Sequence, residues 1–158
     1  MKLKLALAAA SMLVAPAFMS ANAQTNVYVS GGYTQFDGDG GADLGAITGR
    51  VGADFGKYWG IEGEGSFGVK KDSGTKLDSE LGAFVVGKLP ISDSFDIFAR
   101  AGWSRIDTSP GGDEDGFAWG AGGEWHVTSQ DGIRADWTRH DYDVGDVDAY
   151  NLSYVRHF

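Results

Sequence analysis

Uncharged, mostly apolar residues alternate with polar, charged or small residues along most of the chain, and this pattern predicts a succession of β-strands. In the clearest stretch, Ile61 and Phe67 lie on one face and Glu64 lies on the other. One set of alternate positions carries almost no charge throughout, and Arg156 near the end of the last stretch is the exception. Eight such stretches are predicted, at 27–33, 47–55, 61–69, 80–89, 95–103, 117–125, 133–138 and 150–158.

The stretches have the length and the connections of a closed barrel that stands in lipid with a polar inside. Ten residues at ~3.3 Å each, tilted by ~45°, cover roughly 23 Å, close to the ~25 Å apolar band of bacterial outer membranes. Short connections alternate with longer polar ones, and an even strand number brings both termini to the short-turn end. The short connections are 56–58, 90–94 and 128–132, and the longer ones are 37–43, 70–76, 106–115 and 141–147. We therefore predict an all-β fold, an eight-stranded antiparallel up-and-down transmembrane barrel.

The N-terminus has the three parts of a secretory signal peptide. Lys2 and Lys4 form a basic region, residues 5–19 are almost continuously apolar, and Ala21-Asn22-Ala23 forms an A-x-A cleavage site. The apolar run is too short for a membrane helix, which needs ~20 residues. We expect a signal peptide at 1–23 and one barrel domain at 24–158.

Composition narrows the function classes. The chain has no cysteine, so disulfide and thiolate chemistry are excluded. Its formal net charge of −9 makes nucleic acid a poor partner, because phosphates require basic patches. The 25 glycines lie within the alternating stretches and at turns, where they permit curvature and close packing.

Charged residues of the predicted inward face form a candidate site. An eight-stranded barrel is just wide enough for side chains to fill its interior, and an unpaired buried charge there is costly. We therefore expect a structural network of ion pairs that closes the lumen, although a narrow ion-conducting path is the alternative. The expected network consists of Arg50, Glu62, Glu64, Glu80, Arg100, Glu124, Arg134 and Asp136.

Catalytic chemistry is not indicated. The inward carboxylates could be glycosidase acids or metal ligands, but a filled tube leaves no substrate cleft. His126, His140 and His157 are separated in the sequence and have no matched Ser or Cys partner. We expect no catalytic residue, no cofactor, no bound metal among these groups, and no enzyme activity.

The longer connections are the better candidates for recognition, because a rigid scaffold positions them. Asp37, Asp39 and Asp43 are spaced as in part of a calcium loop, but Thr48 stands where the closing glutamate of an EF-hand would be. Further acidic groups lie at 113–115 and 141–148. Solvated loops explain these groups, and divalent cations that bridge to lipopolysaccharide phosphates are the alternative. Lys70, Lys71 and Lys76 could instead contact anionic sugars or phosphates directly.

Several features of the chain carry a family resemblance: the signal peptide, the segments 49–53, 60–68, 98–102 and 120–125, and the terminal Phe158. Together they resemble the small eight-stranded outer-membrane barrels of Gram-negative bacteria, the OmpA-type and OmpX-type porin-like family. The resemblance implies the outer membrane as the location, and lipid and lipopolysaccharide as surroundings. It also implies that the barrel-assembly machinery reads Tyr150, Leu152, Tyr154 and Phe158 on the last strand, although Arg156 stands where an apolar residue is usual.

These observations favour a monomeric barrel of the cell envelope with a structural or surface-interaction role. Two alternatives remain at this point. One is the narrow pore, and the other is a soluble periplasmic barrel that holds an apolar ligand, like a lipocalin. The lipocalin-like alternative requires the apolar face to point inward and the charged residues to point outward.

Overall fold

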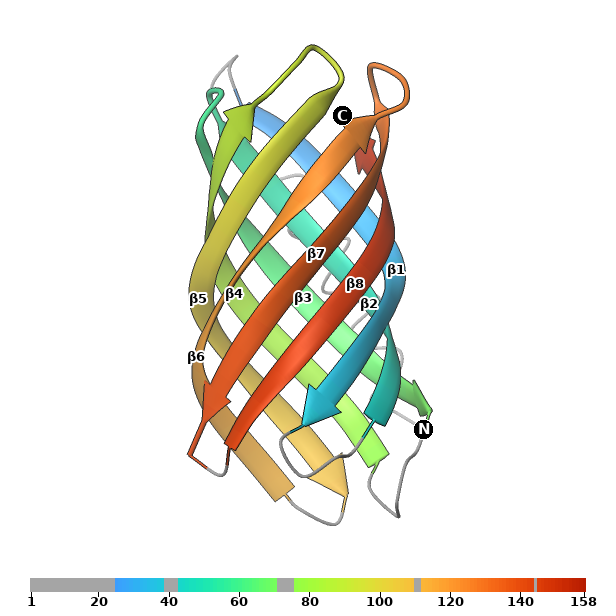
Figure 1. Cartoon of the computed structure of the whole chain (residues 1–158), viewed down its shortest axis with the longest axis vertical. Coiled ribbons are helices and arrows are strands. Elements are labelled where there is room, and N and C mark those ends of the chain that lie inside the picture. The colour runs from blue at the N-terminus through green and yellow to red at the C-terminus, as the bar shows by residue number, and fades with distance from the viewer. Residues whose placement is uncertain (1–24, 39–42, 71–75, 110–111, 144) are drawn as a thin grey trace.

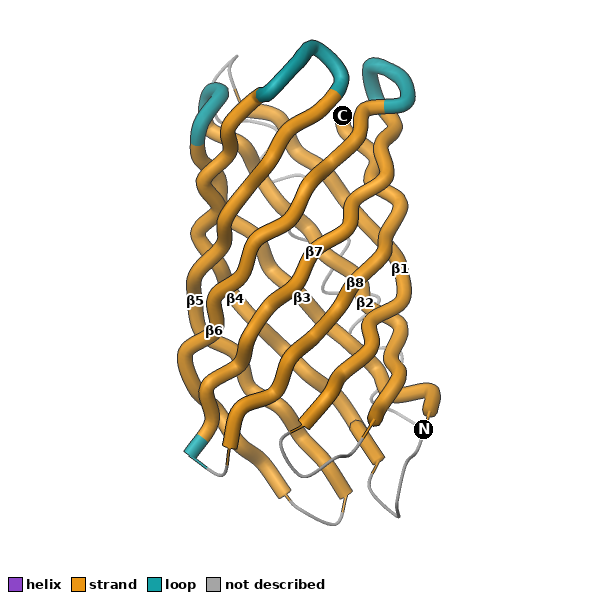
Figure 2. The backbone as a smooth tube through the Cα atoms, viewed as in Figure 1, coloured by secondary structure: helices purple, strands orange, loops and turns teal. Residues whose placement is uncertain are grey.

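The computed structural model describes residues 25–38, 43–70, 76–109, 112–143 and 145–158, so the predicted signal peptide at 1–23 lies outside the described residues. Eight strands follow one another in these parts of the chain (Figures 1 and 2). None of the described segments is a helix long and apolar enough to cross a membrane. The strands are β1 (Thr25–Gly38), β2 (Asp43–Phe55), β3 (Trp59–Lys70), β4 (Lys76–Pro90), β5 (Phe95–Ser109), β6 (Gly112–His126), β7 (Asp131–Tyr142) and β8 (Gly145–His157).

The strands close into one antiparallel barrel in which each pairs with its sequence neighbours and β1 pairs with β8. The predicted fold is therefore confirmed. Thr25 at the start of β1 lies opposite Phe55 at the end of β2, and Phe158 follows β8 at the same end of the barrel. We call this the short-turn end, because the turns 56–58, 91–94 and 127–130 lie there (Figure 2), and we call the opposite end the loop end.

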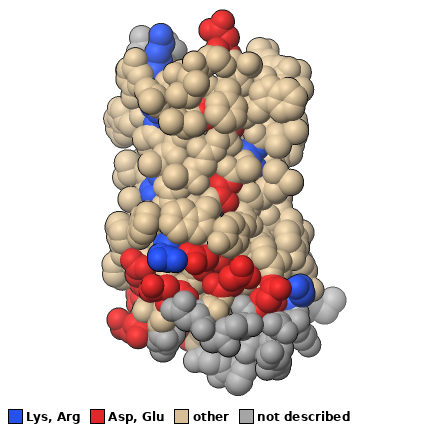
Figure 3. Space-filling model, viewed as in Figure 1, with Lys and Arg blue, Asp and Glu red and all other residues tan. Residues whose placement is uncertain are grey.

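The two faces of each strand have opposite character. On β4, Leu81, Val85 and Leu89 are 50%, 59% and 52% exposed on the outer wall, while Phe84 and Val86 point inward and are buried. Figure 3 shows a wall that is mostly uncharged over its middle. An apolar outer wall around a charged interior is the opposite of the lipocalin-like arrangement.

The structure differs from the prediction at the loop end. β5 extends to Ser109 and β6 begins at Gly112, so pairing continues through most of the predicted loop 106–115. The predicted connections 37–43 and 141–147 are shortened in the same way. The connection 70–76 is not, because β3 ends at Lys70, β4 begins at Lys76, and the pairs between these two strands reach only Ser66 and Glu80. The alternation of residue types stops where both faces meet water, but the backbone hydrogen bonds of an antiparallel pair do not depend on side-chain polarity.

The interior is also less uniformly polar than predicted. A cluster of buried apolar side chains lies inside the barrel towards the loop end, and we call it the apolar layer. The inward alternation of the strands continues beyond the charged positions, and the residues there are apolar. The apolar layer consists of Phe36, Leu44, Ala46, Leu77, Ile106, Tyr142 and Ala149.

Candidate functional site: the barrel interior and its short-turn mouth

Six of the eight predicted network residues form one connected group in the middle of the barrel. We call this group the ion layer: Arg50, Glu62, Glu64, Arg100, Arg134 and Asp136. All six side chains are buried, with at most 8% of each residue exposed. Three guanidinium groups face three carboxylates, so the formal charges of the layer balance.

Arg50 connects opposite walls of the barrel. Its Nη1 and Nη2 donate to the Asp136 oxygens at 2.6 and 2.9 Å, and its Nε donates to Glu64. The bond to Asp136 is bidentate, the geometry in which a guanidinium binds a carboxylate most strongly. Because β2 and β7 are not neighbours in the barrel, this contact crosses the lumen.

Glu62 is the most heavily bonded carboxylate of the ion layer. Arg134 Nη1 and the Tyr28 hydroxyl each donate to its Oε2 at 2.7 Å, and Arg100 Nη2 lies 3.1 Å from its Oε1. Arg100 Nη1 also donates to Glu64 at 2.8 Å. Each carboxylate is therefore shared between guanidiniums, which offsets part of the cost of removing these charges from water.

Aromatic rings cover two of the guanidiniums. The Arg100 guanidinium carbon lies 3.6 Å from the centre of the Phe84 ring, and that of Arg134 lies 4.0 Å from the centre of the Phe98 ring. A planar guanidinium stacks favourably on such a face while its edge donates hydrogen bonds. The rings also fill space that water would otherwise occupy.

Glu80 lies apart from the ion layer. Its Oε2 accepts a hydrogen bond from Ser66 at 3.0 Å, and its Oε1 has no hydrogen-bond partner among the described residues. Ser66 belongs to a belt of neutral side chains that continues through Thr48 and Thr34, with oxygen-to-oxygen distances of 2.7 and 2.6 Å. This belt lies between the ion layer and the apolar layer.

Glu124 is the other predicted residue outside the ion layer, and it lies at the short-turn mouth. Its Oε1 is 2.5 Å from His157 Nε2 and 3.5 Å from His126 Nδ1. His126 Nε2 is in turn 2.8 Å from Asp96 Oδ2. The histidines are separated in the sequence, so this group was not predicted. We call it the mouth cluster (Asp96, Glu124, His126 and His157).

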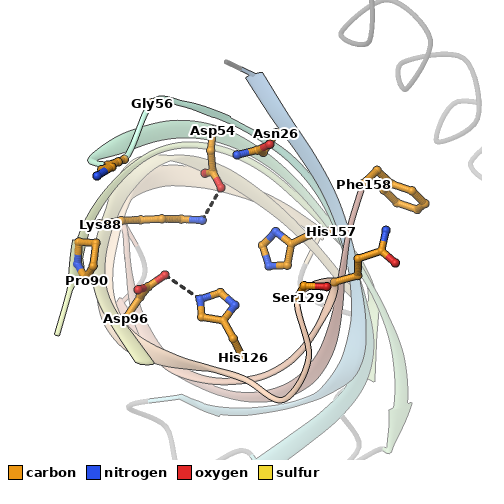
Figure 4. Close-up of a pocket in the computed structure, with 12 residues that line it drawn as sticks. Asn26, Asp54, Gly56, Lys88, Pro90, Asp96, His126, Ser129, His157 and Phe158 are labelled. Atoms are coloured by element: carbon orange, nitrogen blue, oxygen red, sulfur yellow. Dashed lines mark hydrogen bonds and ion pairs between the residues drawn. The ribbon is translucent and has the colours of Figure 1, made fainter. Parts of the chain in front are cut away.

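The mouth cluster borders a pocket of about 360 Å³ that lies within the rim of the barrel (Figure 4). On the other side of the pocket, Lys88 Nζ donates to Asp54 Oδ2 at 2.7 Å. Ser129 and Gln130 from the turn between β6 and β7, and the terminal Phe158, complete this part of the lining. A signal was present in the sequence, because Glu124 and His126 are two residues apart on one inward face and His157 ends a strand at the same mouth.

The third histidine lies deeper. His140 Nδ1 is 2.7 Å from the Ser104 hydroxyl and 3.2 Å from the Tyr142 hydroxyl. Ser104 and His140 are each 1% exposed, so no substrate reaches this pair. The pair therefore lies inside the barrel beside the apolar layer, away from solvent.

On the last strand, the predicted assembly residues project outward, and Tyr150, Leu152 and Tyr154 are 50%, 61% and 53% exposed. Arg156 follows on the same face, and its Nη1 donates to Asp131 on β7 at 2.6 Å. Asp131 also accepts hydrogen bonds from Tyr154 and Thr128. The charge that interrupts the apolar face is thus paired at the edge of the wall.

The loop end carries most of the acidic side chains, and Figure 3 shows them gathered there. Some are paired with bases: Asp113 with Arg105, Asp148 with Arg139 at 2.9 Å, and Asp43 with Lys70 at 3.3 Å. Asp39 and Lys71 lie outside the described residues, and for Lys76 only the backbone is described. Of the predicted group Asp37, Asp39 and Asp43, the structure describes only Asp37 and Asp43, which lie opposite each other on β1 and β2.

A closed eight-stranded antiparallel barrel with an apolar outer wall and a charged interior defines the protein as a small outer-membrane barrel. The comparison with family models agrees, because the model of the outer membrane protein beta-barrel domain matches residues 5–158. The chain belongs to this family, as its sequence resemblance predicted. No curated protein matches the chain.

Solved structures of other small barrels share the fold at low sequence identity. The N-terminal β-barrel domain of Pseudomonas aeruginosa OprF is 13% identical with a TM-score of 0.64, and the match covers 84% of this chain and 97% of that one. Ail, the attachment invasion locus protein of Yersinia pestis, is 16% identical with a TM-score of 0.63, covering 85% and 99%. Neisserial surface protein A is 15% identical with a TM-score of 0.59, covering 85% and 96%.

Proposed function

We propose that the protein is an integral barrel of a Gram-negative outer membrane with a structural or surface-interaction role, no catalytic activity and a lumen closed to ions. The observation that carries this proposal is the ion layer, in which three guanidiniums and three carboxylates bind one another across the barrel. Its position at mid-height favours a scaffold that holds the wall together.

The order of the interior layers supports a closed lumen. An ion that enters at the short-turn end would have to separate the bonds between Arg50 and Asp136 and then cross the apolar layer. An apolar constriction opposes the passage of ions because it cannot replace their hydration shells. Barrels of eight strands are filled by side chains, and water-filled pores belong to larger ones.

Single-channel recording in planar bilayers tests the closed lumen. The folded protein should give no stable conductance steps, while a sixteen-stranded porin in the same bilayers gives them. Stable steps from the wild type that Glu64→Gln abolishes would contradict the proposal and favour the narrow pore.

The acidic loop end supports a role in binding cations more than polyanions. Ail is known in complex with sucrose octasulfate, a heparin analogue, but a dense anion would be repelled by the acidic groups that gather here. We expect weak, exchangeable binding of Ca²⁺ or Mg²⁺ that links this end to lipopolysaccharide phosphates, with the protein as a monomer.

Calorimetry on the folded protein separates these partners. Millimolar Ca²⁺ should give heat that weakens in Asp113→Asn, and sucrose octasulfate should give none at moderate salt. No heat with Ca²⁺, or saturable binding of the octasulfate, would contradict the assignment. Sedimentation in detergent gives the oligomeric state in the same samples.

A further inference from the structure

The mouth cluster combines two imidazoles and a buried carboxylate within reach of one another. One ligand atom from each of Glu124, His126 and His157 lies within 4.8 Å of the others. The two imidazole ring centres are 5.5 Å apart, and the residues come from β6 and β8. Two histidines and a carboxylate are a frequent ligand set for Zn²⁺.

The distances suit a metal ion with small side-chain movements. Two ligand atoms that each bind a metal at ~2.1 Å in tetrahedral geometry are about 3.4 Å apart. His126 Nδ1 and Glu124 Oε1 are 3.5 Å apart. His157 Nε2 and Glu124 Oε1 are hydrogen-bonded at 2.5 Å, so they need to separate by about 1 Å when a metal replaces the proton.

Asp96 orients one of the imidazoles. When His126 Nε2 donates its hydrogen to Asp96 Oδ2 at 2.8 Å, its Nδ1 carries a free lone pair on the side of Glu124. A carboxylate that fixes the tautomer of a metal-binding histidine in this way is a common feature of zinc sites. Asp96 therefore acts as a positioning residue and not as a ligand.

The surroundings allow a cation to enter. The pocket lies against both histidines within the rim of the barrel (Figure 4), so water or a small anion can occupy a fourth coordination position. Lys88 is engaged by Asp54 at 2.7 Å on the opposite side and does not pair with Glu124. With neutral imidazoles, the carboxylates of Glu124 and Asp96 give the mouth cluster a negative charge.

We propose that Glu124, His126 and His157 bind a late first-row divalent metal ion such as Zn²⁺ at the short-turn mouth, with Asp96 as the orienting carboxylate. Nitrogen ligands favour Zn²⁺, Ni²⁺ or Cu²⁺ over Ca²⁺ and Mg²⁺, which prefer oxygen. This site is separate from the closed lumen and the acidic loop end, and it does not depend on either role.

Calorimetry with Zn²⁺ on folded, tag-free, EDTA-treated protein tests the proposal. Millimolar Ca²⁺ in the buffer occupies sites made of carboxylates alone. The wild type should bind one Zn²⁺ per chain with a dissociation constant on the order of 1 µM or lower. His126→Gln and His157→Gln should each weaken binding by about 100-fold or more, and Asp96→Asn by about 10-fold to 100-fold. Refolding in detergent makes the samples independent of cellular assembly.

Ser129→Ala serves as the control, because Ser129 lines the same pocket without belonging to the mouth cluster. It should bind Zn²⁺ like the wild type, and a heat-dependent gel shift should show that every variant is folded. If the wild type binds no Zn²⁺, or if the two histidine variants bind it as tightly as Ser129→Ala does, the proposal is wrong. A wild type that binds no Zn²⁺ overturns the proposal even where a variant fails to fold.

Discussion

Removal of one charge from the ion layer should destabilise the barrel far more than the same substitution just outside it. Glu62 and Glu80 are both glutamates of the barrel interior, 3% and 1% exposed. Glu62 contacts all three guanidiniums of the ion layer and the Tyr28 hydroxyl, whereas Glu80 accepts one hydrogen bond from Ser66. Glu62→Gln and Glu80→Gln therefore form a matched pair.

The expected magnitudes differ. Removal of one partner from a buried ion pair costs about 3–5 kcal/mol, and Glu62→Gln leaves three guanidiniums against two carboxylates. The amide retains one acceptor oxygen, so we expect Glu62→Gln to lower the free energy of unfolding by about 3 kcal/mol, the low end of this range. Glu80→Gln keeps an acceptor for Ser66, and a neutral hydrogen bond contributes only about 1 kcal/mol. This variant should therefore lose about 1 kcal/mol or less of its free energy of unfolding.

Urea unfolding in lipid vesicles measures both values. The tryptophans of the outer wall, such as Trp119 and Trp125, leave lipid for water on unfolding and report the transition by fluorescence. A double-mutant cycle with Arg134→Met isolates the pair with Glu62, and the coupling should exceed 1 kcal/mol. Equal losses for the two glutamine variants would refute the view that the ion layer stabilises the barrel as a connected group.

Three further changes test other parts of the structure. Gly102→Ala should destabilise the barrel by about 1–3 kcal/mol in the same urea assay, because a methyl group there would overlap the Ala83 carbonyl of the neighbouring strand β4. Gly31→Ala, with open space around it, should be neutral. Hydrogen bonds, first from the Tyr154 hydroxyl, lower the pKa of Asp131 at the short turn to about 2. The folded pKa lies below the unfolded value, so these bonds stabilise the folded state fully above about pH 4 and lose their effect as the pH falls towards 2. NMR titration of Asp131 should show the low pKa, and Tyr154→Phe should raise it. Deletion of Phe158 should reduce the amount of folded protein in the outer-membrane fraction of expressing cells without altering refolding in vitro, and equal reductions in both would contradict a role in recognition by the assembly machinery.

Much of the fold could be predicted because a barrel wall separates two environments residue by residue. The alternation along 61–69 identified the inward Glu62 and Glu64, and the structure buries both. Strand ends were predicted less well, because Asp107 and Asp113 are polar but still pair across β5 and β6. The alternation of apolar and polar residues ends at the membrane surface, whereas the backbone hydrogen bonds between strands continue into the water.

Contacts across the lumen could not be predicted from the sequence. The bond between Arg50 and Asp136 joins residues on β2 and β7, and its existence depends on the tilt and closure of the barrel. Closure also brings His157 on β8 to Glu124 and His126 on β6. Periodicity assigns a face to each residue but gives no depth relative to residues on distant strands.

The assignment of the two faces to lipid and interior is most directly tested by two single cysteines, since the chain has none of its own. Ala121 projects from the outer wall on β6 and Ala118 is buried inside on the same strand, so Ala121→Cys and Ala118→Cys differ chiefly in facing. Each variant is labelled with a fluorescent maleimide in urea, where both thiols can ionise, and is then folded into vesicles that contain brominated lipids. The label on Ala121→Cys should be strongly quenched by the lipid bromines, and the label on Ala118→Cys should be weakly quenched or should prevent folding. Strong quenching of folded Ala118→Cys together with weak quenching of Ala121→Cys would contradict the account and place the charged residues on the outside.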